Sequence, residues 1–309
     1  MAILFNAKVS SIEAWQSALS EALPGQEFRL FPDVGAKHEI EYALVWDHPK
    51  GDLATYPNLR AIFLIGAGAD HLLADKTLPD GIPIVRLVDD VSVRDMTHYT
   101  VFWVLFHHRQ FGTFMDNQRN AEWTRVVAPP PNQRRIGFLG LGHMGSHAAM
   151  VLSEMGFDVS GWSRSQKDLA GINCYTGDGG FVRVLGSSDI LINMLPLTPE
   201  TNGVLNANAF ALLPRSAFLI NLGRGAAIHQ ASLLEALDSG QLAGAALDVF
   251  EVEPLPKSHP FWSHPKIYVT PHIGGPTQEE SAIKTVVANI KAVELGNMPG
   301  PIWQPDSGY

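Results

Sequence analysis

The sequence contains little cysteine, little charge and no long apolar run. Its single cysteine, Cys174, rules out a disulfide within the 309 residues and fits a reducing compartment. No apolar run approaches the roughly 18–20 residues of a membrane helix, and the opening MAILFNAKVS predicts a strand rather than a leader. Lys and Arg number 22 against 31 Asp and Glu, and the net charge of −9 disfavours nucleic acids and anionic membranes as partners. We therefore expect a soluble cytoplasmic protein.

The apolar segments that are present form two alternating series of strands and helices. Short runs at 2–5, 27–31, 42–46, 61–64 and 83–87 predict strands, and 12–23 has helical spacing. The segment 92–111 predicts a long helix, and 117–135, with its three prolines, predicts a loop. The second series has strands at 136–139, 158–162, 189–194, 218–222, 245–249 and 267–270, before a last helix at 277–295. Strands alternating with helices predict parallel, doubly wound sheets of the α/β class.

A glycine-rich loop follows the first strand of the second series. Gly140, Gly142 and Gly145 form the pattern GxGxxG between RRIGFL and a helical segment. The first glycine permits a tight turn, the second lets a pyrophosphate approach the backbone, and the third lets helix and strand pack closely. This context predicts a dinucleotide site at the start of the helix. His143 and His147 are four residues apart, but no acidic third ligand follows, so we expect no metal.

The second strand of this series ends in Trp162-Ser163-Arg164-Ser165. NAD-binding folds normally place an Asp or Glu here, facing the ribose hydroxyls. A carboxylate would repel a 2′-phosphate, whereas Arg164 can pair with it and Ser163 and Ser165 can hydrogen-bond to it. We therefore expect NADPH as the cofactor, with NADH bound more weakly. A solvated basic turn is the alternative interpretation.

Three polar residues, Arg224, Glu253 and His272, follow successive predicted strands of the second series. The carboxyl ends of parallel strands form the edge at which such sheets bind ligands. An Arg can hold a carboxylate, a His can give a proton and a Glu can keep that His charged, which together suit the reduction of a 2-keto acid. Singly, each residue is explained as well by a surface Arg, a solvated Glu or a core His.

Longer stretches of the sequence resemble the D-isomer-specific 2-hydroxyacid dehydrogenase family. They are GFLGLGHMG, LPLTPETNGVLN, INLGRGAAIHQASLLEAL, GAALDVFEVEPLP and TPHIGG, in family order and spacing. YALVW, GAGADHLL and IVRLVDD resemble the glyoxylate/hydroxypyruvate reductase branch. The resemblance implies two doubly wound domains: a discontinuous, flavodoxin-like substrate domain of residues 1–98 plus 277–309, and a Rossmann dinucleotide-binding domain of residues 99–276.

The resemblance also implies a role for each matched residue. Arg224 would bind the substrate carboxylate and keto oxygen, and His272 would be the general acid in reduction. Glu253 would pair with His272 and favour its charged form, and Asp248 would hold the nicotinamide carboxamide. Trp46 either walls the substrate pocket or is a plain core residue. Further cofactor contacts are expected from His143, Met144, Leu195 and Pro196, and backbone contacts to the substrate carboxylate from Gly66, Ala67 and Gly68.

These expectations combine into an NADPH-preferring reductase of small 2-keto acids, acting on glyoxylate and hydroxypyruvate. Two alternatives stay open. One is a dehydrogenase for a larger or phosphorylated D-2-hydroxy acid, and the other is a non-enzymatic, corepressor-like protein that senses NAD(P)H. Homologous folds dimerise through the region of residues 92–123, so the resemblance implies a homodimer.

Overall fold

The computed structural model describes residues 2–7, 12–46, 48–66, 68–69, 72 and 75–303. The chain divides into two compact units: unit 1 is Met1–Ser92 with Thr277–Tyr309, and unit 2 is Val93–Pro276. The chain first passes from unit 1 to unit 2 inside helix α3 (Asp90–His108), between Ser92 and Val93. The family resemblance places this boundary between residues 98 and 99. Among the described residues, no helix has both the length and the apolar character needed to cross a membrane.

Unit 1 is built on a five-stranded parallel sheet in the order β2-β1-β3-β4-β5. This is the expected flavodoxin-like order. The apolar runs of β1, β3 and β4 are buried on both faces, as is typical of parallel strands. The strands are β1 (Ala2–Asn6), β2 (Glu27–Leu30), β3 (Ile40–Val45), β4 (Ala61–Leu64) and β5 (Ile84–Val85).

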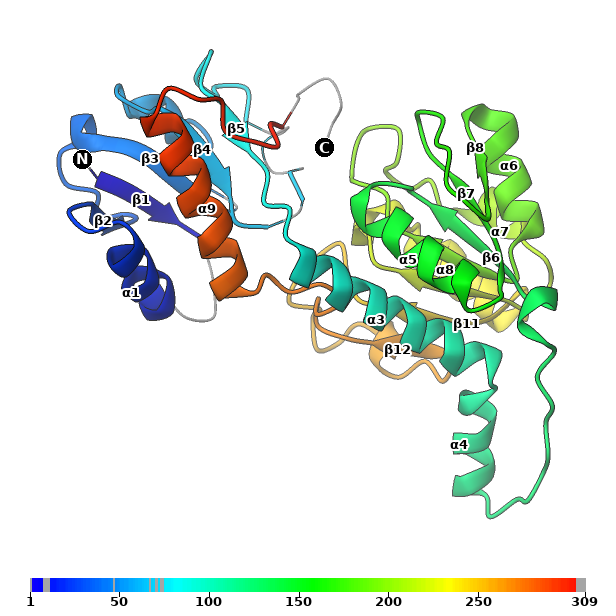
Figure 1. Ribbon diagram of the computed structural model, residues 1–309. Coiled ribbons are helices and arrows are strands. Elements are labelled where there is room, and N and C mark those ends of the chain that lie inside the picture. Colours follow the sequence, from blue (N-terminus) through cyan, green and yellow to red (C-terminus); the bar gives the residue numbers. More distant parts are fainter. Residues whose placement is uncertain are drawn as a thin grey trace. The chain divides into compact units, whose positions relative to one another are not determined.

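Helices α1 (Ile12–Ala22) and α9 (Glu279–Glu294) cover one face of this sheet (Figure 1). Trp15 and Leu19 are four residues apart in α1, and their shared helical face packs into one core with α9. The opposite face is covered by the 3-10 helix η2 (Leu53–Thr55) and by Trp303. The last helix therefore belongs to unit 1.

Unit 2 is built on a seven-stranded parallel sheet in the order β12-β11-β10-β9-β6-β7-β8. The order reverses between β6 and β9, which is the switch point of the Rossmann fold. The sequence predicted six of these strands and missed β8 (Ile172–Tyr175), a short edge strand in which only Ile172 is buried. The others are β6 (Arg135–Leu139), β7 (Asp158–Trp162), β9 (Ile190–Asn193), β10 (Ala217–Asn221), β11 (Leu242–Leu247) and β12 (Ile267–Val269).

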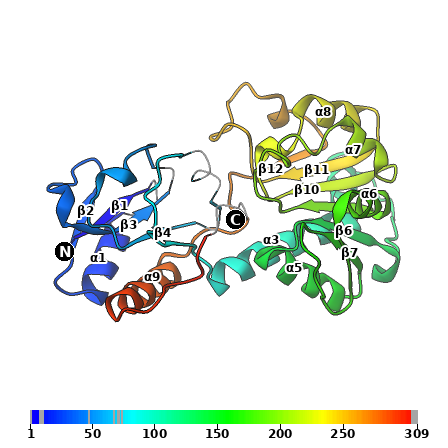
Figure 2. The same cartoon turned by 90° about the horizontal axis from the view of Figure 1, so that it is seen from above.

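Helices cover both faces of the unit 2 sheet, as Figure 2 shows. Helices α3 and α5 (His143–Glu154) pack on one face, where α5 contributes Ala148, Ala149 and Leu152 to the core. The other face carries α6 (Gly177–Ser187), α7 (Ala207–Leu212) and α8 (Gln230–Asp238). The predicted doubly wound α/β architecture is therefore confirmed.

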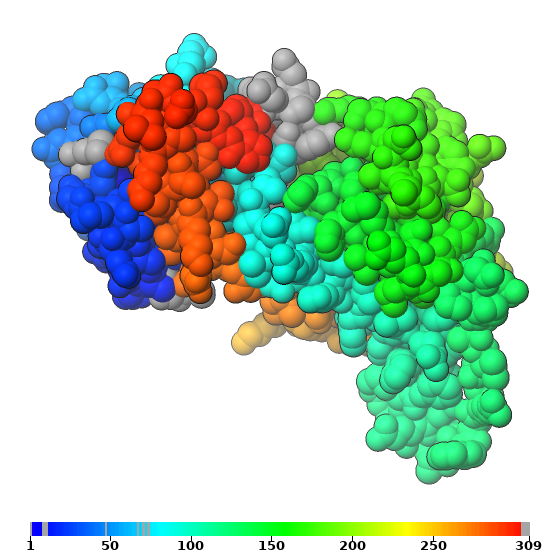
Figure 3. All heavy atoms as spheres, viewed as in Figure 1, coloured from blue at the N-terminus to red at the C-terminus, as the bar shows by residue number. Residues whose placement is uncertain are grey.

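Helix α4 (Phe111–Arg119) follows α3 and extends into the stretch that was predicted to be a loop. Residues 120–130, between α4 and the 3-10 helix η3 (Pro131–Gln133), contain neither helix nor strand. Figures 1 and 3 show α4 and this stretch projecting from the rest of unit 2. Several apolar side chains here are exposed, namely Phe111, Met115, Trp123 and Val127.

Candidate active site

The candidate residues of unit 2 lie just beyond the carboxyl ends of its strands. Because all of these strands are parallel, their carboxyl ends share one edge of the sheet. The residues that follow β6, β7, β9, β10, β11 and β12 are, in that order, Gly140, Ser163, Leu195, Arg224, Asp248 and His272.

The glycine loop has the geometry that its sequence predicted. Gly140 has a φ of +102°, and its N–H donates to the carbonyl of Trp162 over 2.9 Å. A Cβ at Gly145 would lie 2.0 Å from the carbonyl oxygen of Gly140, so only glycine lets α5 pack this closely on the turn. Gly142 is exposed and has no atom within 4 Å of its Cβ position. This open backbone at the start of α5, next to exposed His143 and half-buried Met144, fits the pyrophosphate of a dinucleotide.

The turn after β7 is held by its first serine. Ser163 is buried, its N–H donates to the carbonyl of Tyr175, and its Oγ donates to the carbonyl of Ser165 over 2.7 Å. The hydroxyl proton of Ser163 is thus used within the turn, and the exposed pair Arg164 and Ser165 is the part that faces solvent. Thr198 and the charge of Arg164 lower the pKa of Glu200, which puts an unpredicted carboxylate near Arg164.

Two buried asparagines connect the loop after β9 with the loop after β10. Asn193 Nδ2 donates to Asn221 Oδ1 over 2.8 Å, and Asn193 Oδ1 accepts the N–H of Leu195. Asn221 Nδ2 in turn donates to the carbonyl of Arg224 over 3.2 Å. One pair of amide side chains therefore holds two candidate segments: the cofactor loop at Leu195 and Pro196, and the backbone of Arg224.

The loop that carries Arg224 also packs against the loop that carries Glu253. A Cβ at Gly225 would lie 1.9 Å from the carbonyl carbon of Phe250, so the two backbones touch where the glycine stands. Phe250 N–H donates to Glu253 Oε1 over 2.8 Å. Arg224 is half-buried, and its guanidinium donates to the carbonyl of Gly223 over 2.9 Å.

Glu253 and His272 form a direct pair. His272 Nδ1 lies 2.8 Å from Glu253 Oε2, with the two side chains 45% and 36% exposed. Burial would raise the pKa of Glu253, but hydrogen bonds from His272 and Phe250 N–H outweigh it, and the charges of His272 and Arg224 act in the same direction. The pKa of Glu253 therefore lies below its ordinary value, so the carboxylate stays ionised beside the imidazole. This arrangement can stabilise an imidazolium and leaves its Nε2 to face a substrate.

Asp248 is buried, and backbone groups saturate much of its carboxylate. Oδ1 accepts the N–H of Ile273 and the hydroxyl of Thr270, and Oδ2 accepts the N–H of Gly274 over 2.7 Å. The side chain that was expected to hold a nicotinamide carboxamide thus also holds the loop that carries His272.

In unit 1, the structure brings Trp46 and Gly66 into contact. A Cβ at Gly66 would lie 2.2 Å from Trp46 Cζ3, so the indole packs directly on the backbone of this loop. Gly68 is half-buried, and Ala67 lies outside the described residues. Thr277 Oγ1 donates to the carbonyl of Ile65, next to the loop. Trp46 thus packs both on the loop that was expected to bind a carboxylate and against the hydrophobic core of unit 1.

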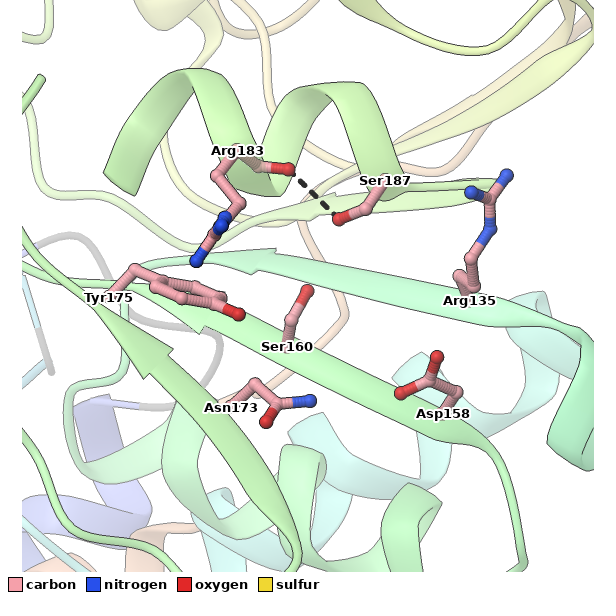
Figure 4. A pocket seen from close by; sticks show the side chains of 7 residues that line it. All are labelled: Arg135, Asp158, Ser160, Asn173, Tyr175, Arg183 and Ser187. Atoms are coloured by element: carbon pink, nitrogen blue, oxygen red, sulfur yellow. Dashed lines mark hydrogen bonds between the residues drawn. The ribbon is translucent and has the colours of Figure 1, made fainter. Parts of the chain in front are cut away.

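A cavity of about 240 Å³ lies elsewhere in unit 2, among the residues drawn in Figure 4. Arg135 and Asp158 begin β6 and β7, so the cavity reaches the amino ends of these strands, at the edge opposite to the glycine loop. Asp189 pairs with Arg135, and the guanidinium of Arg183 lies over the ring of Tyr175. These charges are engaged with protein groups, so the cavity lacks the features of the site described above.

A protein-family model matches most of the unit 2 sequence. The model describes the NAD-binding domain of D-isomer-specific 2-hydroxyacid dehydrogenases and matches residues 101–274, which is more than half of the chain. The chain belongs to the D-isomer-specific 2-hydroxyacid dehydrogenase family. A glyoxylate/hydroxypyruvate reductase A from Serratia proteamaculans is 39% identical, and the match covers 100% of both chains.

Solved structures of family members agree with this assignment. A D-isomer-specific 2-hydroxyacid dehydrogenase from Xanthobacter autotrophicus, in complex with NADPH and MES, is 41% identical with a TM-score of 0.94, over 100% of this chain and 99% of that chain. An NADPH-dependent glyoxylate/hydroxypyruvate reductase from Sinorhizobium meliloti, in complex with NADP and sulfate, is 35% identical with a TM-score of 0.92 and the same coverage. The resemblance to the family and to its reductase branch is therefore confirmed.

The structure also contains groups near these residues that sequence reasoning missed. Asn193 and Asn221 each end an otherwise apolar strand, ILIN and AFLIN, and this repeated ending was a usable signal. Tyr99, which hydrogen-bonds to Thr270, gave no such signal, because the two are 171 residues apart. His147, considered above as a metal ligand, instead hydrogen-bonds through Nδ1 to Thr97 Oγ1 over 2.7 Å.

Proposed function

We propose that this protein is an NADPH-dependent reductase that converts small 2-keto acids, glyoxylate and hydroxypyruvate, into 2-hydroxy acids. The observation that carries the proposal is the pair of His272 and Glu253, with Nδ1 and Oε2 2.8 Å apart, at the same sheet edge as Arg224 and the glycine loop. Two of the relatives named above are glyoxylate/hydroxypyruvate reductases, which supports the choice of substrate. The two solved structures contain NADPH and NADP, which supports the choice of cofactor.

The side chains of unit 2 supply the proton and bind the acid. When bound, NADPH supplies the hydride that reduces the keto carbon. Arg224 pairs with the substrate carboxylate through its planar guanidinium and polarises the keto oxygen. His272 donates the proton on Nε2 to that oxygen, so that the C=O double bond becomes a C–OH group. Glu253 stays ionised and stabilises the imidazolium through Nδ1.

Further residues are assigned to cofactor and substrate as part of the same proposal. Residues 99–276 bind the dinucleotide, and residues 1–98 with 277–309 contribute to binding the acid. The cofactor contacts are Gly140, Gly142, His143, Met144, Gly145, Ser163, Arg164, Ser165, Leu195, Pro196 and Asp248. The N–H groups of residues 66–68 bind the substrate carboxylate, and Trp46 limits the space for the rest of the acid. The packing of Trp46 on Gly66 supports this pairing.

We also propose that the protein is a homodimer of the cytoplasm. Trp123 is fully exposed and Val127 is 75% exposed on the projecting segment after α4, and a monomer rarely leaves such apolar side chains in water. A second copy of the chain covers them in this proposal. The single cysteine fits a reducing compartment.

Steady-state rates with a panel of keto acids test the proposed function. Glyoxylate, hydroxypyruvate, pyruvate and 2-oxoglutarate are each compared with NADPH and with NADH. We expect the highest kcat/KM for glyoxylate or hydroxypyruvate with NADPH. A preference for a larger or phosphorylated acid would give the site a different substrate, and cofactor binding without turnover of any acid would indicate a dinucleotide sensor.

A further inference from the structure

Three backbone N–H groups of the loop that carries His272 donate to Asp248. The N–H groups of Ile273 and Gly274 donate to its two carboxylate oxygens over 2.9 and 2.7 Å, and the N–H of His272 donates to its carbonyl over 2.9 Å. His272 itself has a φ of +54°, in the left-handed region that favours glycine. A histidine keeps this backbone conformation only where its surroundings fix it, and the contacts to Asp248 do so.

The carboxylate of Asp248 is held from the other side by two hydroxyl groups. Thr270 Oγ1 donates to Asp248 Oδ1 over 2.6 Å, and Tyr99 Oη hydrogen-bonds to the same Thr270 oxygen. Thr270 has one hydroxyl proton, which it gives to Asp248, so Tyr99 must be the donor in the second bond. Burial raises the pKa of Tyr99 to about 12, and the phenol therefore keeps the proton that this donation needs.

Helix α3 supplies Tyr99 and also contacts the far end of the loop. Figure 1 shows α3 beside β12, and Trp103 of α3 packs on Tyr268 of β12 with ring centroids 5.2 Å apart. A Cβ at Gly274 would lie 3.5 Å from Met96 Sδ and 3.5 Å from Tyr99 Cδ1. The hydroxyl chain thus runs from a packed helix, through Thr270, to the carboxylate that orients the loop.

We propose that Tyr99 and Thr270 are positioning residues, whose hydroxyl groups hold Asp248 and thereby keep His272 aligned with Glu253. This inference rests on the proposed function, in which His272 is the proton donor. Neither residue is assigned a contact with the substrate. Without the bond from Thr270, the carboxylate of Asp248 can rotate, the loop can relax from its left-handed conformation, and Nδ1 of His272 can move away from Glu253. A displacement of about 1 Å in a catalytic group is enough to cost a rate factor of about 10².

The variants that test this differ by single hydroxyl groups. Thr270→Val keeps the shape and removes the hydroxyl, Thr270→Ser keeps the hydroxyl, and Tyr99→Phe removes only the phenol oxygen. Thr100→Val is the matched control, because the Thr100 hydroxyl bonds to Met96 within the same helix. We expect kcat/KM to fall by about 10- to 100-fold in Thr270→Val and Tyr99→Phe, with near-wild-type values in Thr270→Ser and Thr100→Val.

Two readouts separate positioning from a general structural role. Hydrogen exchange of the peptide that contains Ile273 and Gly274 should speed up in Thr270→Val and Tyr99→Phe in the protein without substrate, and not in Thr270→Ser or Thr100→Val. The pH at which the reductive rate falls should also move down in the first two variants, because His272 loses its alignment with Glu253.

The inference is overturned if exchange at Ile273 and Gly274 is unchanged in Thr270→Val and Tyr99→Phe, or if Thr270→Ser is as impaired as Thr270→Val. If Thr270→Val does not fold, Tyr99→Phe against Thr100→Val decides the question. If the wild-type protein reduces no keto acid, the proposed function fails, and hydrogen exchange alone still decides whether the hydroxyl chain orders the loop.

Discussion

Glu253 accepts one hydrogen bond on each carboxylate oxygen: Oε1 from the N–H of Phe250 and Oε2 from Nδ1 of His272, both at 2.8 Å. The hydrogen bond from the backbone restricts the rotation of the carboxylate, and Oε2 is thereby directed toward the imidazole. The same stretch of chain touches Gly225, the neighbour of Arg224. His272, Glu253 and Arg224 are thus linked through neighbouring backbone segments.

Replacing His272 with alanine should remove the general acid. The reductive kcat should fall by about 10²–10⁴, which is the usual effect of losing such a group. The Kd for NADPH should change little, because the side chain is assigned to proton transfer. Steady-state rates and a fluorescence titration measure the two effects. His264→Ala is the control, since His264 precedes β12, at the opposite end of this strand from His272, and pairs with Asp238. A near-wild-type rate in His272→Ala would contradict the assignment.

Replacing Glu253 with glutamine should change the pH dependence of the reaction. The hydrogen bonds from His272 and from the N–H of Phe250 lower the pKa of Glu253 and favour its ionised carboxylate. Reduction needs the protonated imidazole, so the wild-type rate should fall as the pH rises. Without the negative charge the imidazolium is less stable, and Glu253→Gln should move this fall to lower pH. A profile of kcat/KM against pH measures the shift, and superimposable profiles would refute the pairing.

Arg224 should not tolerate replacement by lysine. A lysine keeps the positive charge but loses the planar pair of donors that matches a carboxylate. Arg224→Lys should therefore lower kcat/KM for glyoxylate and hydroxypyruvate by about 10-fold or more, on the scale of one lost charged hydrogen bond. Unchanged kcat/KM with every keto acid would show that Arg224 serves only the local fold.

Arg224, Glu253, His272 and the glycine loop could be proposed as site residues from the sequence because they follow buried strands, and parallel strands bring their carboxyl ends to one edge of the sheet. The sequence did not indicate β8, because INCY has one buried residue and no clear alternation. Hydrogen bonds between residues far apart in the chain could not be predicted either, because no sequence pattern around Tyr99 indicates a contact with Thr270. The use of the Ser163 hydroxyl inside its own turn depends on backbone geometry that composition does not encode.

Acid should destabilise the fold through His107. Burial lowers the pKa of His107 to about 4, and the nearby charge of Arg134 acts in the same direction. An unfolded histidine titrates near about 6.5, so below that pH the unfolded chain binds the additional proton and the free energy of unfolding decreases. This decrease in the free energy of unfolding develops progressively as the pH falls from about 6.5 to about 4. It should amount to about 1–3 kcal/mol.

His107→Phe tests this, because a phenyl ring can keep the stack on Phe218, whose ring centroid lies 4.5 Å from that of His107. Urea unfolding at several pH values should show a shallower decline in the variant. His38→Gln is the control, since His38 is exposed, and its decline should match the wild type. Equal slopes for His107→Phe and wild type would mean that other groups cause the acid sensitivity.

Cofactor choice should depend on Arg164. This exposed residue closes β7 where NAD-binding relatives place a carboxylate, and it is assigned to the 2′-phosphate of NADPH. A charged pair in a partly open site contributes on the order of 1.5–3 kcal/mol, or about 10- to 150-fold in affinity. Arg164→Ala should raise the Kd for NADPH by about this factor and leave the Kd for NADH nearly unchanged.

Matched variants locate the effect at this turn. Ser163→Asp combined with Arg164→Ala should weaken NADPH binding further, because the new carboxylate repels the phosphate. Arg183→Ala is the control, since Arg183 lies over Tyr175 in the same unit, and it should leave both affinities unchanged. The preference of the wild type should also weaken with salt, because the contact joins partly exposed charges. Fluorescence titrations with both cofactors measure these constants. Equal affinity of the wild type for NADH and NADPH would show that Arg164 is only a solvated surface residue.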